Sequence, residues 1–221
     1  MDLYEVMRTT FACRDFTDDP VPDSVLYEIF ENARFAPSGG NRQGNHVVVV
    51  RDAGTKQALS DLAVPAAKRY TAMRANGENP WNSVVPTAVS DEEIEATKPA
   101  SSLVSTFVEA PVVLVFGVDL RVVASMDQFV PRVGVISGAS IYPFVWNALM
   151  AARGLGYGGT ITTLTSSEEP KVQELIGFPS YVAVAAAVPL GKPKKQLTKL
   201  TRRPVEDIAK MERFDGAPLK G

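Results

Sequence analysis

The sequence of 221 residues is poor in reactive side chains, with one cysteine, Cys13, and one histidine, His46. A single cysteine excludes an intrachain disulfide, and these two residues provide too few soft ligands for a zinc site. A globule of this length buries roughly 70% of the surface of its unfolded chain, so one domain over residues 1–221 needs no such staple. The formal net charge is only −2 and the basic residues are scattered, which argues against a nucleic-acid partner.

Hydrolytic and nucleotide-hydrolysing motifs are also missing. The chain has no G-x-S-x-G nucleophile elbow and no G-x-x-x-x-G-K-[ST] phosphate loop. His46 begins a run of valines, where a structural histidine is expected, and Cys13 has no histidine near it in the sequence. An enzyme with no metal ligands and no acid–base pair would take its chemistry from an organic cofactor.

The N-terminus, MDLYEVMRTT, carries acids and no apolar core, so we expect neither a signal nor a transit peptide and a cytoplasmic protein. One segment, Val133 to Ala152, has no charge and is long enough to span a bilayer. It is only moderately apolar, because it contains Gly134, Gly138 and several other small or polar residues. We predict a helix buried on all sides, at the core or at a dimer contact, and no membrane partner.

Hydrophobic periodicity predicts an α+β fold. Helices are expected over residues 2–9, over 23–36 with Asp23 or Ser24 as the cap, and over 55–74 with an interruption near Pro65. Three apolar, β-branched runs predict buried strands, and the first of them, HVVVV at residues 46–50, is typical of a strand covered on both faces. The other two are APVVLVFGVD at 110–119 and YVAVAAAVPLG at 181–191.

Two segments lack regular patterning. Residues 76–100 contain three prolines and an acidic patch, and we interpret them as a lid over a functional site, with plain disorder as the alternative. The tail over residues 192–221 carries only one short helical stretch, at 205–211. Because such a tail cannot form a core of its own, we expect it to lie over the domain or over a partner subunit.

Two loops are rich in small residues. The stretch ENARFAPSGGNRQGNHVVVV, residues 31–50, places serine, glycine and amide side chains between a helix and a strand, as if to approach something flat. In GLGYGGT the glycines match the spacing G-x-G-x-x-G, but a helix is expected before them, so this is not a dinucleotide fingerprint. Backbone N–H groups at Gly158, Gly159 and Thr160 could still contact a planar ligand. A plain helix end would need only one glycine.

Arginines and amides complete a pattern of ligand-binding groups. The planar guanidinium is suited to phosphate, and Arg14, Arg202 and Arg203 lie near opposite ends of the chain. With the amides of Asn41 and Gln43, these residues would suit a planar ring that carries a phosphate tail.

Over residues 3–208 the sequence resembles the nitroreductase family of flavin enzymes. The resemblance is carried by ARFAPSGGNRQ, by ARGLGYGG and by the C-terminal elements IGFP, VPLGKPKK and RRPVEDI. It implies a central mixed sheet flanked by helices, with a long buried dimer helix and a C-terminal tail that extends over the partner subunit. It also implies a homodimer that holds one FMN at each subunit interface and uses NAD(P)H as co-substrate.

The resemblance assigns cofactor contacts position by position and assigns no catalytic side chain and no metal. Arg14 would contact the phosphate or ribityl end of the flavin, and Arg202 or Arg203 would complete the phosphate clamp. The ring would be lined by Pro37, Ser38 and Gly39, hydrogen-bonded by Asn41 and Gln43, and approached by the backbone of Gly158 and Gly159.

The sequence departs from the family pattern at two places. Many relatives have Arg-Arg-Ser where this chain has Thr10, Phe11 and Ala12, and Pro-Trp where it has Gly44 and Asn45. Losing one charge-assisted hydrogen bond costs about 1.5–3 kcal/mol, so we expect weaker FMN retention unless Arg8 or Arg203 substitutes.

The expected activity is FMN-dependent transfer of hydride from NAD(P)H to a nitroaromatic, a quinone or an activated alkene, by a ping-pong mechanism. The acceptor, the choice between NADH and NADPH, and use of a deazaflavin are not specified by the motifs. Two alternatives fit the same resemblance. One is flavin-dependent reductive removal of a substituent, or cleavage of the flavin, and the other is a flavin-binding protein without turnover.

Overall fold

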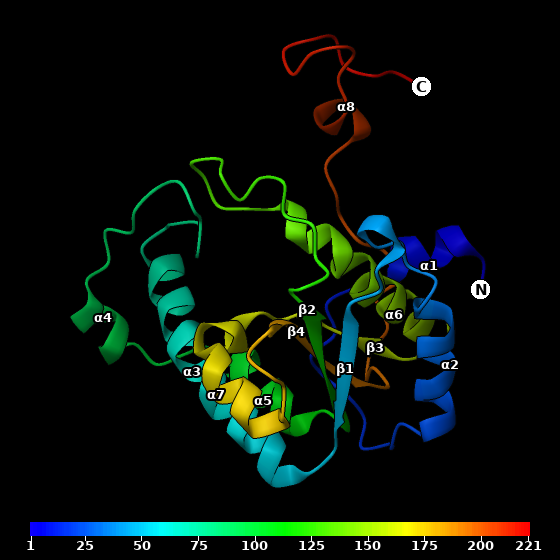
Figure 1. The fold of residues 1–221 in the computed structure, drawn as a ribbon, viewed down its shortest axis with the longest axis vertical. Helices are drawn as coiled ribbons and strands as arrows, with labels where there is room; N and C mark the ends of the chain where they lie inside the picture. The colour runs from blue at the N-terminus through cyan, green and yellow to red at the C-terminus, as the bar shows by residue number, and fades with distance from the viewer.

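A four-stranded antiparallel sheet lies at the centre of the computed structural model, which describes residues 1–221 (Figure 1). The strand order is β1-β2-β4-β3, and every neighbouring pair is antiparallel. Among the named strands of one chain the prediction of a mixed sheet is therefore wrong, although an isolated bridge between Ala12 and Gly159 is parallel. Strand direction depends on how the intervening helices return the chain to the sheet, which hydrophobic patterning does not encode. The strands are β1 (Asn45–Val50), β2 (Val112–Asp119), β3 (Gly158–Gly159) and β4 (Val182–Gly191).

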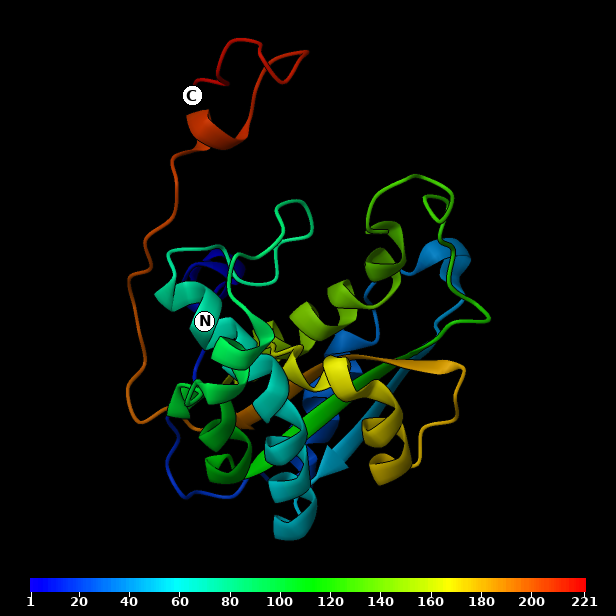
Figure 2. The same cartoon turned by 90° about the vertical axis from the view of Figure 1, so that its left-hand side faces the viewer.

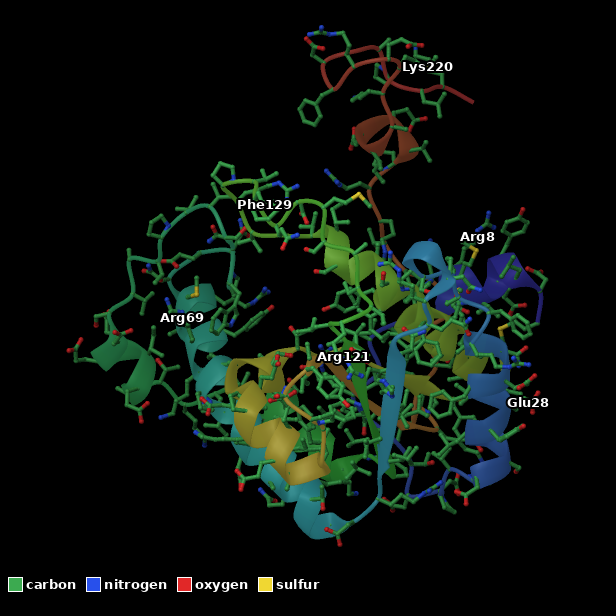
Figure 3. All side chains as sticks on the ribbon, in the orientation of Figure 1. Arg8, Glu28, Arg69, Arg121, Phe129 and Lys220 are labelled. Atoms are coloured by element: carbon green, nitrogen blue, oxygen red, sulfur yellow. The ribbon has the colours of Figure 1, made fainter.

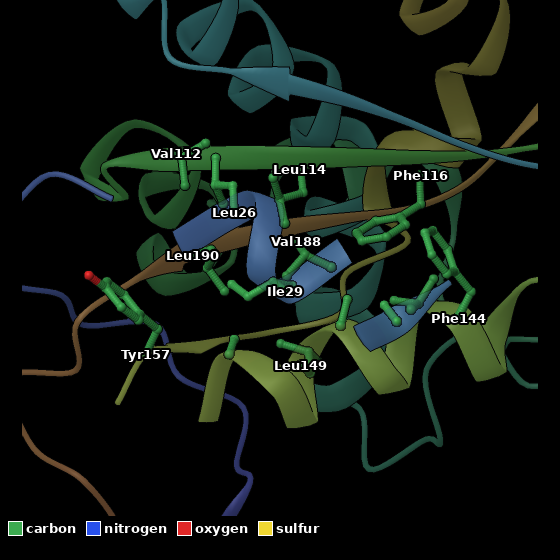
Figure 4. Packing of buried hydrophobic residues seen from close by; sticks show 14 of the residues in the cluster. Leu26, Ile29, Val112, Leu114, Phe116, Phe144, Leu149, Tyr157, Val188 and Leu190 are labelled. Carbon is green, nitrogen blue, oxygen red and sulfur yellow. The ribbon is translucent and has the colours of Figure 1, made fainter. Parts of the chain in front are cut away.

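Strand β2 is buried along its whole length and divides the core in two. Because side chains alternate along a strand, Leu114 and Phe116 point to one face, whereas Val113 and Val115 point to the other. The first face packs against α2 and α6 (Figure 4), and the second packs against α3, α5 and α7. Each of these side chains stabilises the fold by about 1.5–3 kcal/mol through burial.

The helices on the first face are α2 (Asp23–Ala33) and α6 (Tyr142–Gly154), and α1 (Leu3–Thr9) packs against α6. Helix α1 begins as expected, because the Asp2 side chain accepts a hydrogen bond of 2.8 Å from the Glu5 amide. Helix α2 has no side-chain cap, since the N-cap position is Pro22. The predicted cap at Asp23 or Ser24 is therefore wrong.

The second face is covered by α3 (Ala53–Ala75), α5 (Ser101–Glu109) and α7 (Glu169–Ile176). Helix α3 runs through Pro65 without a break, contrary to the predicted interruption. A proline inside a helix leaves the carbonyl four residues earlier without its partner. Here that carbonyl belongs to Asp61, which is exposed, as is Pro65, so water can take the place of the missing N–H group.

The apolar segment from Val133 to Ala152 is not one buried helix. A short 3-10 helix, η2 (Ile136–Ser140), precedes α6, and Val133 and Val135 are exposed. The prediction of a long helix buried on all sides is therefore wrong for its first half. Glycines interrupt that half, and Pro143 starts a separate helix because proline is tolerated in a first turn. No helix of the chain is both long and apolar enough to cross a membrane.

Strand β1 is an edge strand and pairs only with β2. Of its valines only Val50 is fully buried, and Val49 is 38% exposed, so the prediction of a strand covered on both faces is wrong within one chain. A continuous valine run does not distinguish a central strand from an edge strand.

The excursion at 76–100 and the tail project from the body, as does the loop between β2 and η2 (Figure 2). Residues 76–100 form an irregular excursion that contains only the short helix α4 (Asp91–Ala96). The tail leaves β4, carries the single-turn helix α8 (Val205–Ile208) and extends away from the domain, with Lys220 at its far end (Figures 1 and 3). Its first residues pair with the N-terminal segment, through Lys192, Lys194 and Gln196, and only the rest of the tail extends away from its own domain. Two more 3-10 helices are η1 (Gly39–Asn41) and η3 (Leu164–Glu168).

Candidate active site

A cavity of about 530 Å³ opens between the N-terminal segment, helix α3 and the segment that follows β3. Its walls combine aromatic, aliphatic and hydroxyl side chains with one cation, and no carboxylate or histidine lines it. The lining residues are Arg14, Ala66, Tyr70, Pro80, Trp81, Leu103, Ile161, Thr162, Thr163, Leu164, Ser166 and Ser167.

Arg14 reaches the cavity because backbone pairing fixes the segment that carries it. The Cys13 amide donates to the Gly159 carbonyl at 3.0 Å, and the Thr17 amide donates to the Lys192 carbonyl at 2.9 Å. The Lys194 amide also donates to the Asp15 carbonyl at 3.1 Å. Arg14 is thus held on both sides by chain segments far away in the sequence.

The Arg14 guanidinium makes no hydrogen bond and no ion pair within the chain, although its neighbour Asp15 pairs with Lys194 at 2.9 Å. A half-buried arginine in a cavity without carboxylates has unused donors in a planar fork. It can therefore bind a phosphate, a carboxylate or a carbonyl edge of a ligand.

Gly158 and Gly159 are buried and pair with β4, so they do not line the cavity. A Cβ atom on Gly158 would lie 3.2 Å from the Cβ of Cys13, and one on Gly159 would lie 2.7 Å from the Pro189 carbonyl oxygen. The glycines therefore make room for the N-terminal segment and for β4. The backbone that meets the cavity begins two residues later, at Ile161.

Cys13 is not available as a nucleophile. Its side chain is 2% exposed, and burial raises the pKa of the thiol above its ordinary value. At neutral pH the group is a protonated, buried thiol.

The loop that carries Ser38 and Gly39 lies against η2 and outside the cavity. The Gly39 amide donates to the Ser140 hydroxyl at 3.3 Å, and the Gln43 amide donates to the Ser38 hydroxyl at 2.9 Å. Asn41 and Gln43 have φ of +53° and +51°, a left-handed conformation that is uncommon for residues other than glycine. Pro37, Asn41 and Gln43 are exposed, so this loop offers its polar groups to something outside its own chain or to solvent.

Arg202 and Arg203 are exposed in the projecting tail and also lie outside the cavity. The only side-chain hydrogen bond of Arg202 goes to the neighbouring Thr201 carbonyl, at 2.8 Å. One chain thus places the predicted cofactor-binding residues in four separate groups: Arg14 at the cavity, Gly158 and Gly159 in β3, the loop against η2, and the tail.

Most of the cavity wall could not be predicted from the sequence. Tyr70 and Trp81 come from α3 and from the excursion at 76–100, and only the fold brings them together. The hydroxyl-rich run after the glycines, residues 160–167, is the signal in the sequence that could have indicated this wall.

Comparison with known proteins identifies the family of the chain. A sequence model of the nitroreductase family matches residues 7–192. An NADH dehydrogenase of Thermus thermophilus is 30% identical over 205 residues, which cover 89% of each chain. An FMN reductase [NAD(P)H] of Bacillus subtilis is 25% identical over 204 residues, which cover 92% of this chain and 70% of that protein.

The fold matches as well. A BluB-like flavoprotein from Clostridium difficile superimposes with a TM-score of 0.71 at 19% identity, covering 96% of this chain and all of the other. With most of its length matched by the family's sequence model, the chain belongs to the nitroreductase family and is an oxidoreductase of that family.

Proposed function

We propose that this chain is an FMN-dependent oxidoreductase that takes hydride from NAD(P)H and reduces a nitroaromatic, a quinone or an activated alkene by a ping-pong mechanism. The observation that carries the proposal is the cavity, which has one unpaired guanidinium, a row of hydroxyls and aromatic walls, but no acid–base pair. Such a site binds and orients a ligand but has no side chain that could perform the chemistry. This is the arrangement expected when the cofactor is the reactive group.

The residues of the cavity fit FMN. A flavin has a flat ring with a carbonyl edge, a polyhydroxyl chain and a phosphate. The free donors of Arg14 suit the carbonyl edge or the phosphate, and the hydroxyls of Thr162, Thr163 and Ser166 suit the polar groups. The absence of a carboxylate from the wall keeps an anionic ligand free of repulsion.

The protein then contributes position and shielding. Bound FMN would supply the two-electron relay between NAD(P)H and the acceptor. Arg14 binds and orients the polar edge of the ligand, while Leu103, Ile161 and Leu164 exclude water from the apolar side. Water exclusion strengthens the electrostatic interactions of the Arg14 guanidinium, because the local dielectric constant falls.

We also propose a homodimer in which a second copy completes the site. This is supported by the separation of the predicted cofactor residues within one chain, since neither the Ser38 loop nor Arg202 lines the cavity of its own chain. Apolar side chains without a partner, such as Phe129 (Figure 3) and Phe214, give further support, because they are 90% and 99% exposed.

The visible spectrum of the purified protein, before and after anaerobic addition of NADPH or NADH, tests the activity. We expect flavin absorbance that is lost on addition of either nucleotide and regained on addition of a nitroaromatic or a quinone. A flavin that neither nucleotide reduces would favour the flavin-binding alternative without turnover. A colourless protein that takes up no FMN would contradict the proposal.

Product analysis separates the remaining alternatives. Simple reduction leaves the carbon skeleton and the substituents of the acceptor in place, and it regenerates intact FMN. Release of a substituent as an anion, or loss of labelled FMN during turnover, would instead indicate reductive removal or flavin cleavage.

A further inference from the structure

Trp81 belongs to the excursion at residues 76–100 but lines the cavity together with Arg14 and Tyr70. It remains 50% exposed, although it is among the largest apolar residues of the chain. A tryptophan whose role was to anchor the excursion would be buried against the body. Half of the surface of Trp81 is instead accessible and can contact a ligand in the cavity.

The backbone of Trp81 is held in an unusual conformation. Its φ is +58°, in the left-handed region that a bulky residue adopts only when the surroundings impose it. Glycine or asparagine would take this position at lower cost. The conformation therefore points to a role for the indole itself at this site.

Two contacts with α3 position the indole. Its Nε1–H group donates to the Ala66 carbonyl at 3.4 Å, and the Arg69 guanidinium carbon lies 5.3 Å from the ring centroid. Arg69 itself approaches Asp91 of α4 at 3.8 Å and lies towards the C-terminal end of α3 (Figure 3). The edge of the ring and one face are thus held by the scaffold, because a cation over an indole face is an attractive contact.

We infer that Trp81 determines which acceptors this enzyme uses, by stacking on the face of a flat, electron-poor ring in the cavity. The inference rests on the proposed function and narrows it. An electron-rich indole attracts nitroaromatic and quinone rings in two ways. Stacking buries a large apolar contact area, and the negative face of the indole quadrupole attracts an electron-poor ring. An acyclic activated alkene presents no ring and gains little from this contact. The preferred acceptors are therefore nitroaromatics and quinones.

Steady-state kinetics on the FMN-loaded enzyme test this selectivity. In Trp81→Leu, the ratio of kcat/KM for a nitrobenzene derivative to kcat/KM for an acyclic enone should fall about tenfold, the equivalent of a lost contact worth about 1.4 kcal/mol. Trp81→Phe should keep most of the ratio, because an aromatic ring remains. The matched control is Val84→Ala, since Val84 is exposed in the same excursion and does not line the cavity. A ratio in Trp81→Leu within twofold of the parent would overturn the inference.

A binding measurement gives a readout that does not depend on turnover. The chain has two tryptophans, so Trp146→Phe leaves Trp81 as the only indole and Trp81→Phe leaves Trp146. Titration with 4-nitrobenzoate should quench the emission of Trp81 in a saturable way. Quenching of Trp146, which lies on α6 and outside the cavity, should rise linearly. Linear quenching of both tryptophans would contradict the inference.

The two experiments also separate this inference from the proposed function. Reduction of ring acceptors without saturable quenching of Trp81 would leave the oxidoreductase function intact and remove the role of Trp81. Saturable quenching in a protein that NAD(P)H does not reduce would support Trp81 as a ring-binding residue and contradict the proposed reaction.

Discussion

Arg14 illustrates how a single side chain can be committed to a ligand by the backbone around it. Its segment is hydrogen-bonded to the Gly159 and Lys192 carbonyls, so the guanidinium has little freedom to find a partner elsewhere. The neighbouring Asp15 is already paired with Lys194. The free donors of Arg14 are therefore the strongest electrostatic feature of the cavity.

Arg14→Ala should weaken FMN binding. Loss of one charge-assisted hydrogen bond costs about 1.5–3 kcal/mol, or roughly a 10- to 150-fold increase in Kd. The measurement is titration of the apoprotein with FMN, followed by flavin fluorescence. Arg74→Ala is the control, because Arg74 is exposed at the end of α3 and does not line the cavity. Equal affinity of the two variants would exclude Arg14 from the FMN site.

A pair of glycine substitutions tests the packing that positions Arg14. In Gly159→Ala the new Cβ would lie 2.7 Å from the Pro189 carbonyl oxygen, so the backbone must shift, at a cost of about 1–3 kcal/mol in the free energy of unfolding. Gly154→Ala meets nothing within 4 Å at the end of α6 and should stabilise by about 0.4–1 kcal/mol. Urea unfolding measures both. A stable Gly159→Ala protein would show that the β3–β4 contact can relax.

At this scale the sequence identified the residues that have a chemical signature. The guanidinium of Arg14 and the amide loop around Asn41 could be predicted as ligand-binding groups because their planar donors suit a phosphate or a carbonyl edge. Tyr70 and Trp81 could not be predicted, since an isolated aromatic residue is compatible with any role until the fold places it. The assignment of Arg14, the Ser38 loop, Gly158, Gly159 and the tail arginines to the FMN site stays a prediction.

Among the elements, the loop between β2 and η2 is organised by one carboxylate. Asp127 is 5% exposed and accepts hydrogen bonds from the Val135 amide at 2.7 Å and from Arg132 at 2.8 Å. The Val135 amide and the Arg132 guanidinium lower the pKa of Asp127 from 3.8 to about 2. The charged carboxylate thus fixes a loop whose apolar residues, such as Phe129, are exposed.

The sign of the pH effect follows from this lowered pKa. The contribution of Asp127 is fully present above pH 3.8 and is lost as the pH falls towards 2, where the carboxyl becomes protonated. Asp127→Asn, which mimics the protonated group, should speed hydrogen exchange of the Val135 amide at neutral pH. Glu92→Gln is the control, because Glu92 is an exposed acid in α4. Unchanged exchange at Val135 would mean that the loop is held by other contacts.

The excursion at residues 76–100 can be removed without cutting the core, because its two ends meet. The Ala100 amide donates to the Thr71 hydroxyl of α3 at 3.1 Å. Replacing residues 77–99 with a short glycine–serine linker should leave FMN binding intact and change kcat/KM for ring acceptors by about tenfold or more, since Trp81 and Pro80 are lost from the wall. If kcat/KM stayed the same for every acceptor, the excursion would not be a substrate-selecting lid.

The elements that could be predicted well from the sequence are those whose hydrophobic pattern is compatible with only one type of secondary structure. The valine-rich runs became β2 and β4, and the spacing of Leu26 and Ile29 became the buried face of α2. The apolar run around Gly138 was misread because it has no periodicity, and apolar content alone does not distinguish a buried helix from an exposed loop that awaits a partner.

At the scale of the whole molecule, the projecting tail exposes apolar side chains that pack against nothing in their own chain. It carries Phe214, which is 99% exposed, and Ile208, which is 64% exposed, at the far end of an extended segment. In an isolated chain these apolar side chains stay in water and contribute no burial of apolar surface. A second copy of the chain would bury them.

Analytical ultracentrifugation tests this arrangement. We expect the parent protein to sediment as a dimer and Phe214→Ala to dissociate about 30-fold more readily, the effect of losing an aromatic anchor worth about 2 kcal/mol. Lys220→Ala, also in the tail but charged and exposed, should dissociate like the parent. A monomeric parent protein would contradict the proposed homodimer.

Strand β2 has a consequence for the thermal behaviour of the molecule. It is hydrogen-bonded to a neighbour along each edge, and its alternating side chains belong to both hydrophobic clusters. If one helical layer unfolded, β2 would lose half of its packing and the other layer would lose the strand against which it packs. The two layers should therefore unfold together. The body is a single cooperative unit, and calorimetry of the protein should show one heat-absorption peak for both layers.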